Sequence, residues 1–185
     1  ELDSAINTIF DITHEKPLGF RAPHFSIRAE NVWAYEELSK RFAYDSSYTT
    51  SLNIEELAEE KIFHFNGNIL HEFFIYEMPI FNGSFKVRSG GTFLRVFPSS
   101  IIIKSLKESI NFGHIPLLYM HPYELIEEFW VPWKEVSYSN LGFFKKVIKV
   151  ARQYQRCKLG VKSVDKKLRD IFLLFDHQGP MKELI

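Results

Sequence analysis

Apolar residues recur at helical spacing over residues 2–14, where Leu2, Ile6, Ile9 and Phe10 fall on one face. Similar amphipathic patterns predict further helices at residues 28–40, 98–111, 141–155 and 163–173. Short runs of aromatic and branched residues predict strands at residues 18–21, 42–44, 73–81, 85–87, 92–97 and 115–120. The opening order of helix, strand, helix and strand is typical of parallel strands joined by crossover helices, so we predict an α/β fold.

Turn residues and one apolar run refine the middle of this prediction. Asn82-Gly83 is a hairpin turn signal, whereas Ser89-Gly90-Gly91 reads only as a flexible turn. Residues 115–120 are continuously apolar, which is the pattern of a strand buried on both faces.

The composition is that of an ordinary globular domain. The 185 residues carry 23 Lys and Arg against 23 Asp and Glu, and a net charge of zero argues against a dedicated nucleic-acid binder. The single cysteine excludes an internal disulfide and a multi-cysteine zinc site. No apolar run approaches the ~20 residues that span a bilayer, and the chain shows no signal-peptide pattern. Localisation therefore stays open.

Polar residues stand where three predicted strands end: Arg21, Asp45 and His121. In parallel α/β folds the chemistry gathers at such strand ends. An aspartate and a histidine at neighbouring ends can hydrogen-bond, which fixes the imidazole tautomer and suits the histidine to general-acid catalysis. Each residue alone also has an ordinary explanation: an ion pair for Arg21, an Asx turn or helix cap for Asp45, and a buried hydrogen-bonded imidazole for His121.

Other chemical motifs are weak or lacking in the sequence. It contains no glycine-rich nucleotide-binding loop and no nucleophile elbow. The basic run at residues 145–156 predicts a solvated helix face, with phosphate or nucleic-acid contact as the alternative.

Four segments, in chain order, resemble motifs of the polysaccharide deacetylase (NodB-homology) family, in the subgroup tied to exopolysaccharide biosynthesis: residues 19–26, 44–47, 90–98 and 118–124. Residues 166–175 are similar to that subgroup's C-terminal extension. The resemblance implies the C-terminal portion of a distorted (β/α)7 barrel over residues 1–135, followed by a helical extension over residues 136–185.

The resemblance also implies an activity, the metal-dependent hydrolysis of N-acetyl groups on the sugars of a surface polysaccharide. His121 would be the general acid that protonates the departing amine, Asp45 would orient His121, and Arg21 would pair with the catalytic base. The backbone N–H of His24 would help hold the oxyanion. The implied substrate-binding residues are Pro23, His24, Phe25, Phe93, Arg95 and Tyr119. Two of these depart from the family, which often has leucine in place of Tyr119 and an aromatic residue in place of His24.

The family's Asp pair and its His-x-x-x-His metal pair do not occur in these 185 residues. We therefore expect a divalent metal, zinc by the resemblance, in the complete domain and none in this chain alone, which would be inactive by itself. The implied partners are an N-acetylated glycan and the missing N-terminal part of the domain, with no nucleic acid and no membrane segment. Two alternatives remain: a non-catalytic carbohydrate-binding module of the same fold, and an interaction protein that uses the basic helix.

Overall fold

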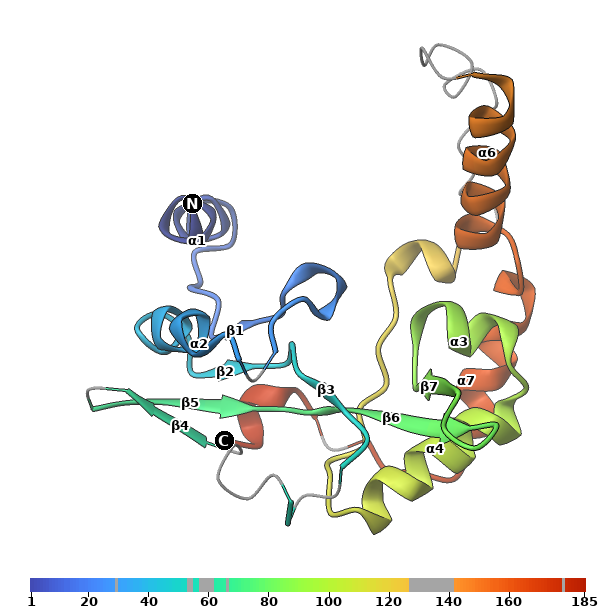
Figure 1. The fold of residues 1–185 in the computed structure, drawn as a ribbon. Coiled ribbons are helices and arrows are strands. Elements are labelled where there is room, and N and C mark those ends of the chain that lie inside the picture. The colour runs from blue at the N-terminus through green and yellow to red at the C-terminus, as the bar shows by residue number, and fades with distance from the viewer. Residues whose placement is uncertain (29, 53–54, 57–61, 66, 127–141, 178) are drawn as a thin grey trace. The chain divides into compact units, whose positions relative to one another are not determined.

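The computed structural model describes residues 1–28, 30–52, 55–56, 62–65, 67–126, 142–177 and 179–185. The chain forms two compact units (Figure 1). Unit 1 comprises Glu1–Glu77, Glu108–Leu117 and Gln178–Ile185, and unit 2 comprises Met78–Lys107 and Leu118–His177. The boundary expected between residues 135 and 136 lies outside the described residues and stays a prediction.

Unit 1 carries the parallel strands that the sequence predicts. Its elements are α1 (Leu2–Thr13), β1 (Gly19–Phe20), η1 (Pro23–Phe25), α2 (Val32–Ser39), β2 (Tyr44–Asp45), β3 (Thr49–Thr50), β4 (Ile62–Phe65), β5 (Asn68–Glu72), the start of β6 (Ile75–Ile80) and η4 (Met181–Glu183). The first sheet has the order β1-β2-β5-β4, in which β1, β2 and β5 are parallel and β4 is antiparallel to β5. The second sheet has the order β3-β6-β7, with β3 parallel to β6. Neither sheet closes on itself through its described strands, so the fold is mixed α/β.

The core of unit 1 forms between the helices and the first sheet. Its buried members come from α2, β5 and the segment between α2 and β2, and they are Tyr35, Leu38, Phe42 and Leu70. The apolar face of α1 adds Leu2 and Ile6 to this cluster. Only part of each predicted apolar face packs, because Ile9, Phe10 and Trp33 are exposed. Helix α2 begins at Val32 rather than at residue 28.

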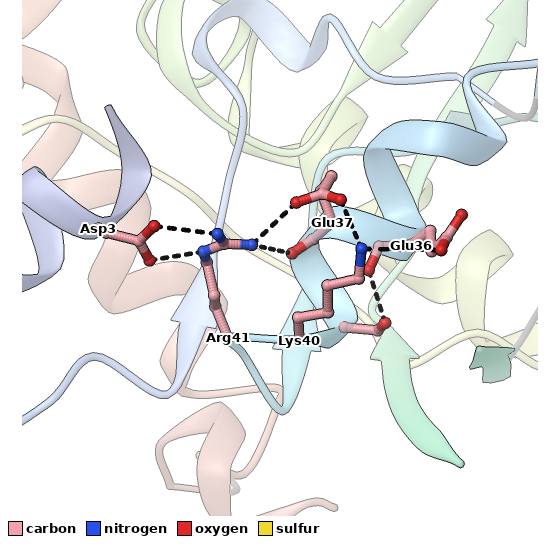
Figure 2. A network of polar contacts seen from close by, with 6 residues as sticks. Asp3, Glu36, Glu37, Lys40 and Arg41 are labelled. Atoms are coloured by element: carbon pink, nitrogen blue, oxygen red, sulfur yellow. Dashed lines mark hydrogen bonds and ion pairs between the residues drawn. The ribbon is translucent and has the colours of Figure 1, made fainter. Parts of the chain in front are cut away.

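A polar network joins α1 to the end of α2 (Figure 2). Arg41 donates two hydrogen bonds to Asp3, from Nε to Oδ1 at 2.7 Å and from Nη2 to Oδ2 at 3.0 Å. Its Nη1 bonds Glu37 at 3.0 Å, and Lys40 contacts Glu37 and Glu36. Because these groups face solvent, the network fixes the direction of α1 more than it adds to stability.

Unit 2 is mainly helical. It contains the rest of β6, β7 (Phe85–Arg88), α3 (Gly91–Val96), most of α4 (Ser99–Asn111), η2 (Pro122–Glu124), α6 (Phe143–Cys157), η3 (Val161–Ser163) and α7 (Val164–Phe172). The Asn82-Gly83 turn joins the neighbouring strands β6 and β7, as the sequence predicts. The helices predicted at residues 98–111, 141–155 and 163–173 correspond to α4, α6 and α7.

The strand predicted at residues 92–97 is wrong, because these residues belong to the helix α3. Leu94 and Arg95 are adjacent and both buried. Neighbouring residues can share the buried side of a helix, whereas in a strand they point to opposite faces. The backbone N–H groups of Leu94 and Phe97 donate to the carbonyl oxygens of Gly90 and Phe93, which closes helical turns in place of the strand that the branched and aromatic composition suggested.

The strand buried on both faces at residues 115–120 is also wrong. Ile115 is exposed, and within the described part of this run only Tyr119 takes part in β pairing, through a single parallel bridge to Gly90. Pro116 lies inside the run and has no N–H to donate, which prevents a continuous ladder.

Arg95 links several elements of unit 2. Its Nε donates to the carboxylate of Glu124 at 3.0 Å, and both side chains are about 1% exposed. Its Nη1 donates to the carbonyl oxygens of Gln155 at 2.6 Å and of Leu159 at 3.2 Å, and its Nη2 donates to Thr92 at 3.0 Å. One guanidinium therefore connects α3, η2 and the C-terminal end of α6.

We expect Arg95→Met to lower the free energy of unfolding by about 3–5 kcal/mol, because it leaves the buried Glu124 carboxylate without its partner. Urea denaturation followed by circular dichroism measures the change. The matched control is Arg169→Met, which removes an exposed pair with Asp165 on α7 and should have little effect. Equal effects of the two substitutions would contradict the central role of Arg95.

Candidate functional site

The parallel strands β1, β2 and β5 of unit 1 end at one edge of the sheet. The register pairs the last residue of β1 with Asp45 of β2, and Asp45 with Glu72 of β5. Arg21 follows β1 directly. The structure thus brings Arg21 and Asp45, both predicted from the sequence, to the edge where ligands gather in parallel α/β sheets.

Asp45 is fully buried, and its carboxylate organises the loop after β2. Ser47 donates to both carboxylate oxygens, from Oγ to Oδ1 at 2.8 Å and from its N–H to Oδ2 at 3.0 Å. The Ser47 Oγ in turn accepts the backbone N–H of Ala22 at 2.7 Å. Asp45 therefore forms an Asx turn and, through Ser47, ties the loops after β1 and β2 together.

Glu72 is the residue of this edge that sequence reasoning missed. Its Oε1 accepts the backbone N–H groups of Ser47 at 3.1 Å and of Tyr48 at 3.0 Å. Its Oε2 is buried and has no hydrogen-bond partner among the described residues. The available signal was a lone carboxylate directly before the aromatic residues Phe73 and Phe74.

Asp45 and Glu72 together form what we call the carboxyl pair. Burial raises the pKa of Asp45, and it raises the pKa of Glu72 well above its usual range, with the negative charge of Asp45 adding to the effect on Glu72. Two buried carboxylates in contact favour one shared proton over two charges. That proton gives Glu72 a hydrogen bond to donate to Asp45.

Arg21 donates hydrogen bonds to the loop after β2, at the residue that follows Asp45. Its Nε donates to the carbonyl oxygen of Ser46 at 3.1 Å, and its Nη2 donates to the Ser46 Oγ at 2.8 Å. The guanidinium carbon also lies 5.9 Å from the centre of the Phe25 ring, within range of a cation–π contact. These contacts hold the guanidinium at the strand edge while the residue remains exposed.

The segment Pro23-His24-Phe25 has an unusual backbone. His24 has φ of 58° and Phe25 has φ of 53°, so two consecutive residues with side chains adopt the left-handed region. Such strain costs of order 1–3 kcal/mol per residue and concentrates at functional sites. Pro23 and His24 are exposed and Phe25 is half-buried, so this strained turn faces solvent beside Arg21.

His121 belongs to unit 2 and stands at the start of η2. It forms a reciprocal capping box with Glu124, in which its side chain accepts the Glu124 backbone N–H and the Glu124 carboxylate accepts the His121 backbone N–H at 3.0 Å. The imidazole Nδ1 lies 3.7 Å from the Glu124 Oε2, and the ring stacks on Tyr123 with centroids 4.9 Å apart. The His121 side chain is 55% exposed. An imidazole held from one side and open on the other is suited to exchange a proton with a ligand.

The remaining predicted substrate-binding residues of unit 2 occupy different environments. Arg95 is buried, and the hydrogen bonds described above engage its guanidinium group. Phe93 is half-buried and stacks on Phe97 with centroids 6.0 Å apart. Tyr119 packs against the backbone of Gly90, and a Cβ placed on Gly90 would lie 2.1 Å from the Tyr119 carbonyl oxygen. The turn that the sequence predicts at Ser89-Gly90-Gly91 is therefore also the place where this segment comes very close to the backbone of Tyr119.

Asp45 and His121 fall in different units, so their predicted hydrogen bond stays a prediction. In unit 1 the carboxyl near Asp45 is that of Glu72, and in unit 2 the carboxylate near His121 is that of Glu124.

Within the part of the chain that the structure describes, no cluster of three or more His, Cys, Asp or Glu residues is arranged to hold a metal ion. Likewise, no described helix is long and apolar enough to cross a membrane. No known protein family, curated protein or solved structure matches this chain. Functional inference therefore rests on the site geometry and on the motifs in the sequence.

The carboxyl pair predicts that unit 1 loses stability as the pH rises. Below about pH 4 the carboxyls are protonated in the folded and the unfolded chain alike, so no charge is buried. Because the folded-state pKa values are raised, stability falls as the pH rises through them. Glu72→Gln removes one titrating group while keeping an acceptor for Ser47 and Tyr48 and a donor for Asp45.

We expect Glu72→Gln to raise the midpoint of thermal unfolding at about pH 8 and to change it little at about pH 4. Calorimetry across this pH range measures the difference, with the exposed Glu15→Gln as control. A variant less stable than the wild type at both pH values would argue against a shared proton.

Gly90→Ala tests the close approach to Tyr119. The added Cβ meets backbone that cannot rotate away, so we expect a loss of about 1–3 kcal/mol in the free energy of unfolding. Gly142→Ala is the matched control, because its φ of −59° suits alanine and its Cβ would meet nothing within 4 Å. Chemical denaturation of the two variants gives the comparison, and equal stabilities would contradict the contact.

Proposed function

We propose that this chain is the C-terminal part of a polysaccharide deacetylase domain, which removes acetyl groups from N-acetylated sugars of a surface polysaccharide. One observation carries the proposal: the exposed His121 imidazole is seated on the buried Glu124–Arg95 ion pair. Hydrolysis of an acetamide requires a proton on the departing amine, and a positioned histidine supplies such a proton at neutral pH.

The capping box supports this role for His121 by fixing its tautomer. The ring nitrogen that accepts the Glu124 N–H cannot carry the proton in the neutral form. The proton therefore sits on the other ring nitrogen, away from Glu124.

Unit 1 would supply the groups around the reacting carbonyl. In this proposal Asp45 orients His121, Arg21 pairs with the catalytic base, and the backbone N–H of His24 holds the oxyanion. Their support is the gathering of Arg21 and Asp45 at one strand edge and the strained backbone at His24. Glu72 joins them as the residue that shares a proton with Asp45.

The proposed fold of the complete domain is a distorted (β/α)7 barrel. The support is that β1, β2 and β5 lie side by side in parallel and in chain order, with α2 between the first two, as in a barrel wall. In such a wall Phe25, Phe93 and Tyr119 are the aromatic side chains proposed to contact the sugar rings.

The divalent metal that the resemblance implies does not fit the residues described here. Asp45 and Glu72 are engaged with Ser47 and Tyr48, and no described cluster offers three metal-binding side chains. The proposal therefore assigns the metal and the activation of water to a part of the domain outside this chain. It assigns to this chain proton donation and the orientation of the substrate.

The decisive experiment measures acetate release from an N-acetylated glycan by the complete protein that carries this sequence. We expect His121→Ala to lower kcat by roughly 10²–10⁴-fold, as loss of a general acid does. The exposed His177→Ala is the matched control and should keep full turnover. Unchanged turnover in His121→Ala would reject the proposed acid.

The same assay separates the enzyme from a carbohydrate-binding module. The ring stack of His121 on Tyr123 offers an exposed aromatic surface that a sugar face could contact. A wild-type protein that binds the glycan without releasing acetate, and loses binding in His121→Ala, would favour the module.

A further inference from the structure

Helix α6 (Phe143–Cys157) has one apolar and one basic side. Phe143, Phe144, Val147 and Ile148 are between 44% and 82% exposed. At 100° per residue these four positions fall within one arc of the helix, and Ala151 lies in the same arc. A folded domain seldom leaves two phenylalanines and two branched residues together in water, so this face is suited to a partner.

The opposite side of α6 is positively charged. Lys145, Lys149 and Arg152 stand at i, i+4 and i+7, share one side of the helix and are all exposed. The sequence of α6 contains no Asp or Glu, although the chain as a whole has no net charge. The positive charge is therefore concentrated locally, which marks α6 as a surface for an anionic partner.

The cationic surface continues past the end of α6. A hollow of about 570 Å³ is lined by Tyr154, Lys158, Gly160 and Lys162. Lys158 and Lys162 at its wall form a second site that can bind phosphate groups, next to the C-terminal end of the helix.

We propose that α6 binds the surface of an anionic phospholipid bilayer. The helix lies in the plane of the interface, with Phe143, Phe144, Val147 and Ile148 in the boundary of the acyl chains and the lysines at the lipid phosphates. A separated apolar face, a basic face and low overall hydrophobicity are the features of helices that lie on membranes rather than across them. A nucleic acid would engage the basic side and leave the four apolar side chains in water, which is why lipid fits this helix better.

The proposal is independent of the deacetylase function, since it uses only the residues of α6 and its C-terminal end. It gives the chain a place at a membrane surface without a spanning segment. Each basic residue near an anionic surface strengthens binding about fivefold, and inserted apolar side chains add to this.

Vesicle co-sedimentation of the full chain tests the proposal. We expect the wild type to bind vesicles of about equal parts phosphatidylcholine and phosphatidylglycerol at least tenfold more tightly than vesicles of phosphatidylcholine alone, and less tightly as salt is raised. Equal binding to the two kinds of vesicle, or no binding to either, would overturn the proposal.

Two variants then separate charge from insertion. Lys145→Gln/Lys149→Gln/Arg152→Gln should weaken binding to the anionic vesicles at least tenfold, and so should Phe143→Ser/Phe144→Ser, which keeps every charge. If the phenylalanine variant bound as well as the wild type, the contact would be electrostatic only and the proposed insertion would be rejected.

The matched control removes lysines and an apolar side chain elsewhere in unit 2, as Lys104→Gln/Lys107→Gln/Leu173→Ser. These residues are also exposed, so their loss should leave vesicle binding unchanged. Hydrogen exchange of the wild type with and without anionic vesicles needs no variant, and slower exchange confined to α6 is expected. Unchanged exchange in α6 on vesicle-bound protein would contradict docking through this helix.

Discussion

The buried ion pair between Arg95 and Glu124 holds together the parts of unit 2 on which both proposals depend. Glu124 seats His121 through the capping box, and Arg95 bonds the carbonyl oxygens at the end of α6. An ion pair out of contact with water stabilises a fold only when its remaining donors are satisfied, because desolvation of the two charges is costly. Arg95 meets this condition through Thr92, Gln155 and Leu159. The hydrogen bonds of the pair thus offset the desolvation of its two charges and hold η2 in a defined geometry.

The buried carboxyls of unit 1 are stabilised in a different way. The oxygens of the carboxyl pair accept hydrogen bonds from the backbone N–H groups of Ser47 and Tyr48 and from the Ser47 hydroxyl, and burial of both carboxyls favours one shared proton. This arrangement fixes the loops at the strand edge, and it makes that edge sensitive to pH in a direction opposite to an ordinary salt bridge. The Asp45 side chain therefore has two roles: it forms the Asx turn, and it shares a proton with Glu72.

Lysine and phenylalanine side chains give α6 a role different from that of the other helices. α1 and α2 each place apolar side chains in the core of unit 1, although others on them are exposed, whereas Phe143, Phe144, Val147 and Ile148 of α6 are all exposed. Amphipathic periodicity alone does not separate these two cases, since both produce the same pattern along the chain. Exposure separates them, and the absence of acidic residues from α6 indicates what kind of surface it meets.

The sequence by itself determined the helices α1, α2, α4, α6 and α7, the strands β1 and β2 and the Asn82-Gly83 turn, because spacing of apolar residues and turn chemistry act within a few residues. It also determined that Arg21 and Asp45 stand where strands end. Only the tertiary structure decided that residues 92–96 form a helix, since the packing of Leu94 and the bonds of Arg95 inside unit 2 outweigh the local strand composition. Only the tertiary structure placed Glu72 against Asp45 and Glu124 against Arg95, because these partners lie 27 and 29 residues apart and meet through strand register and packing, which no local pattern encodes.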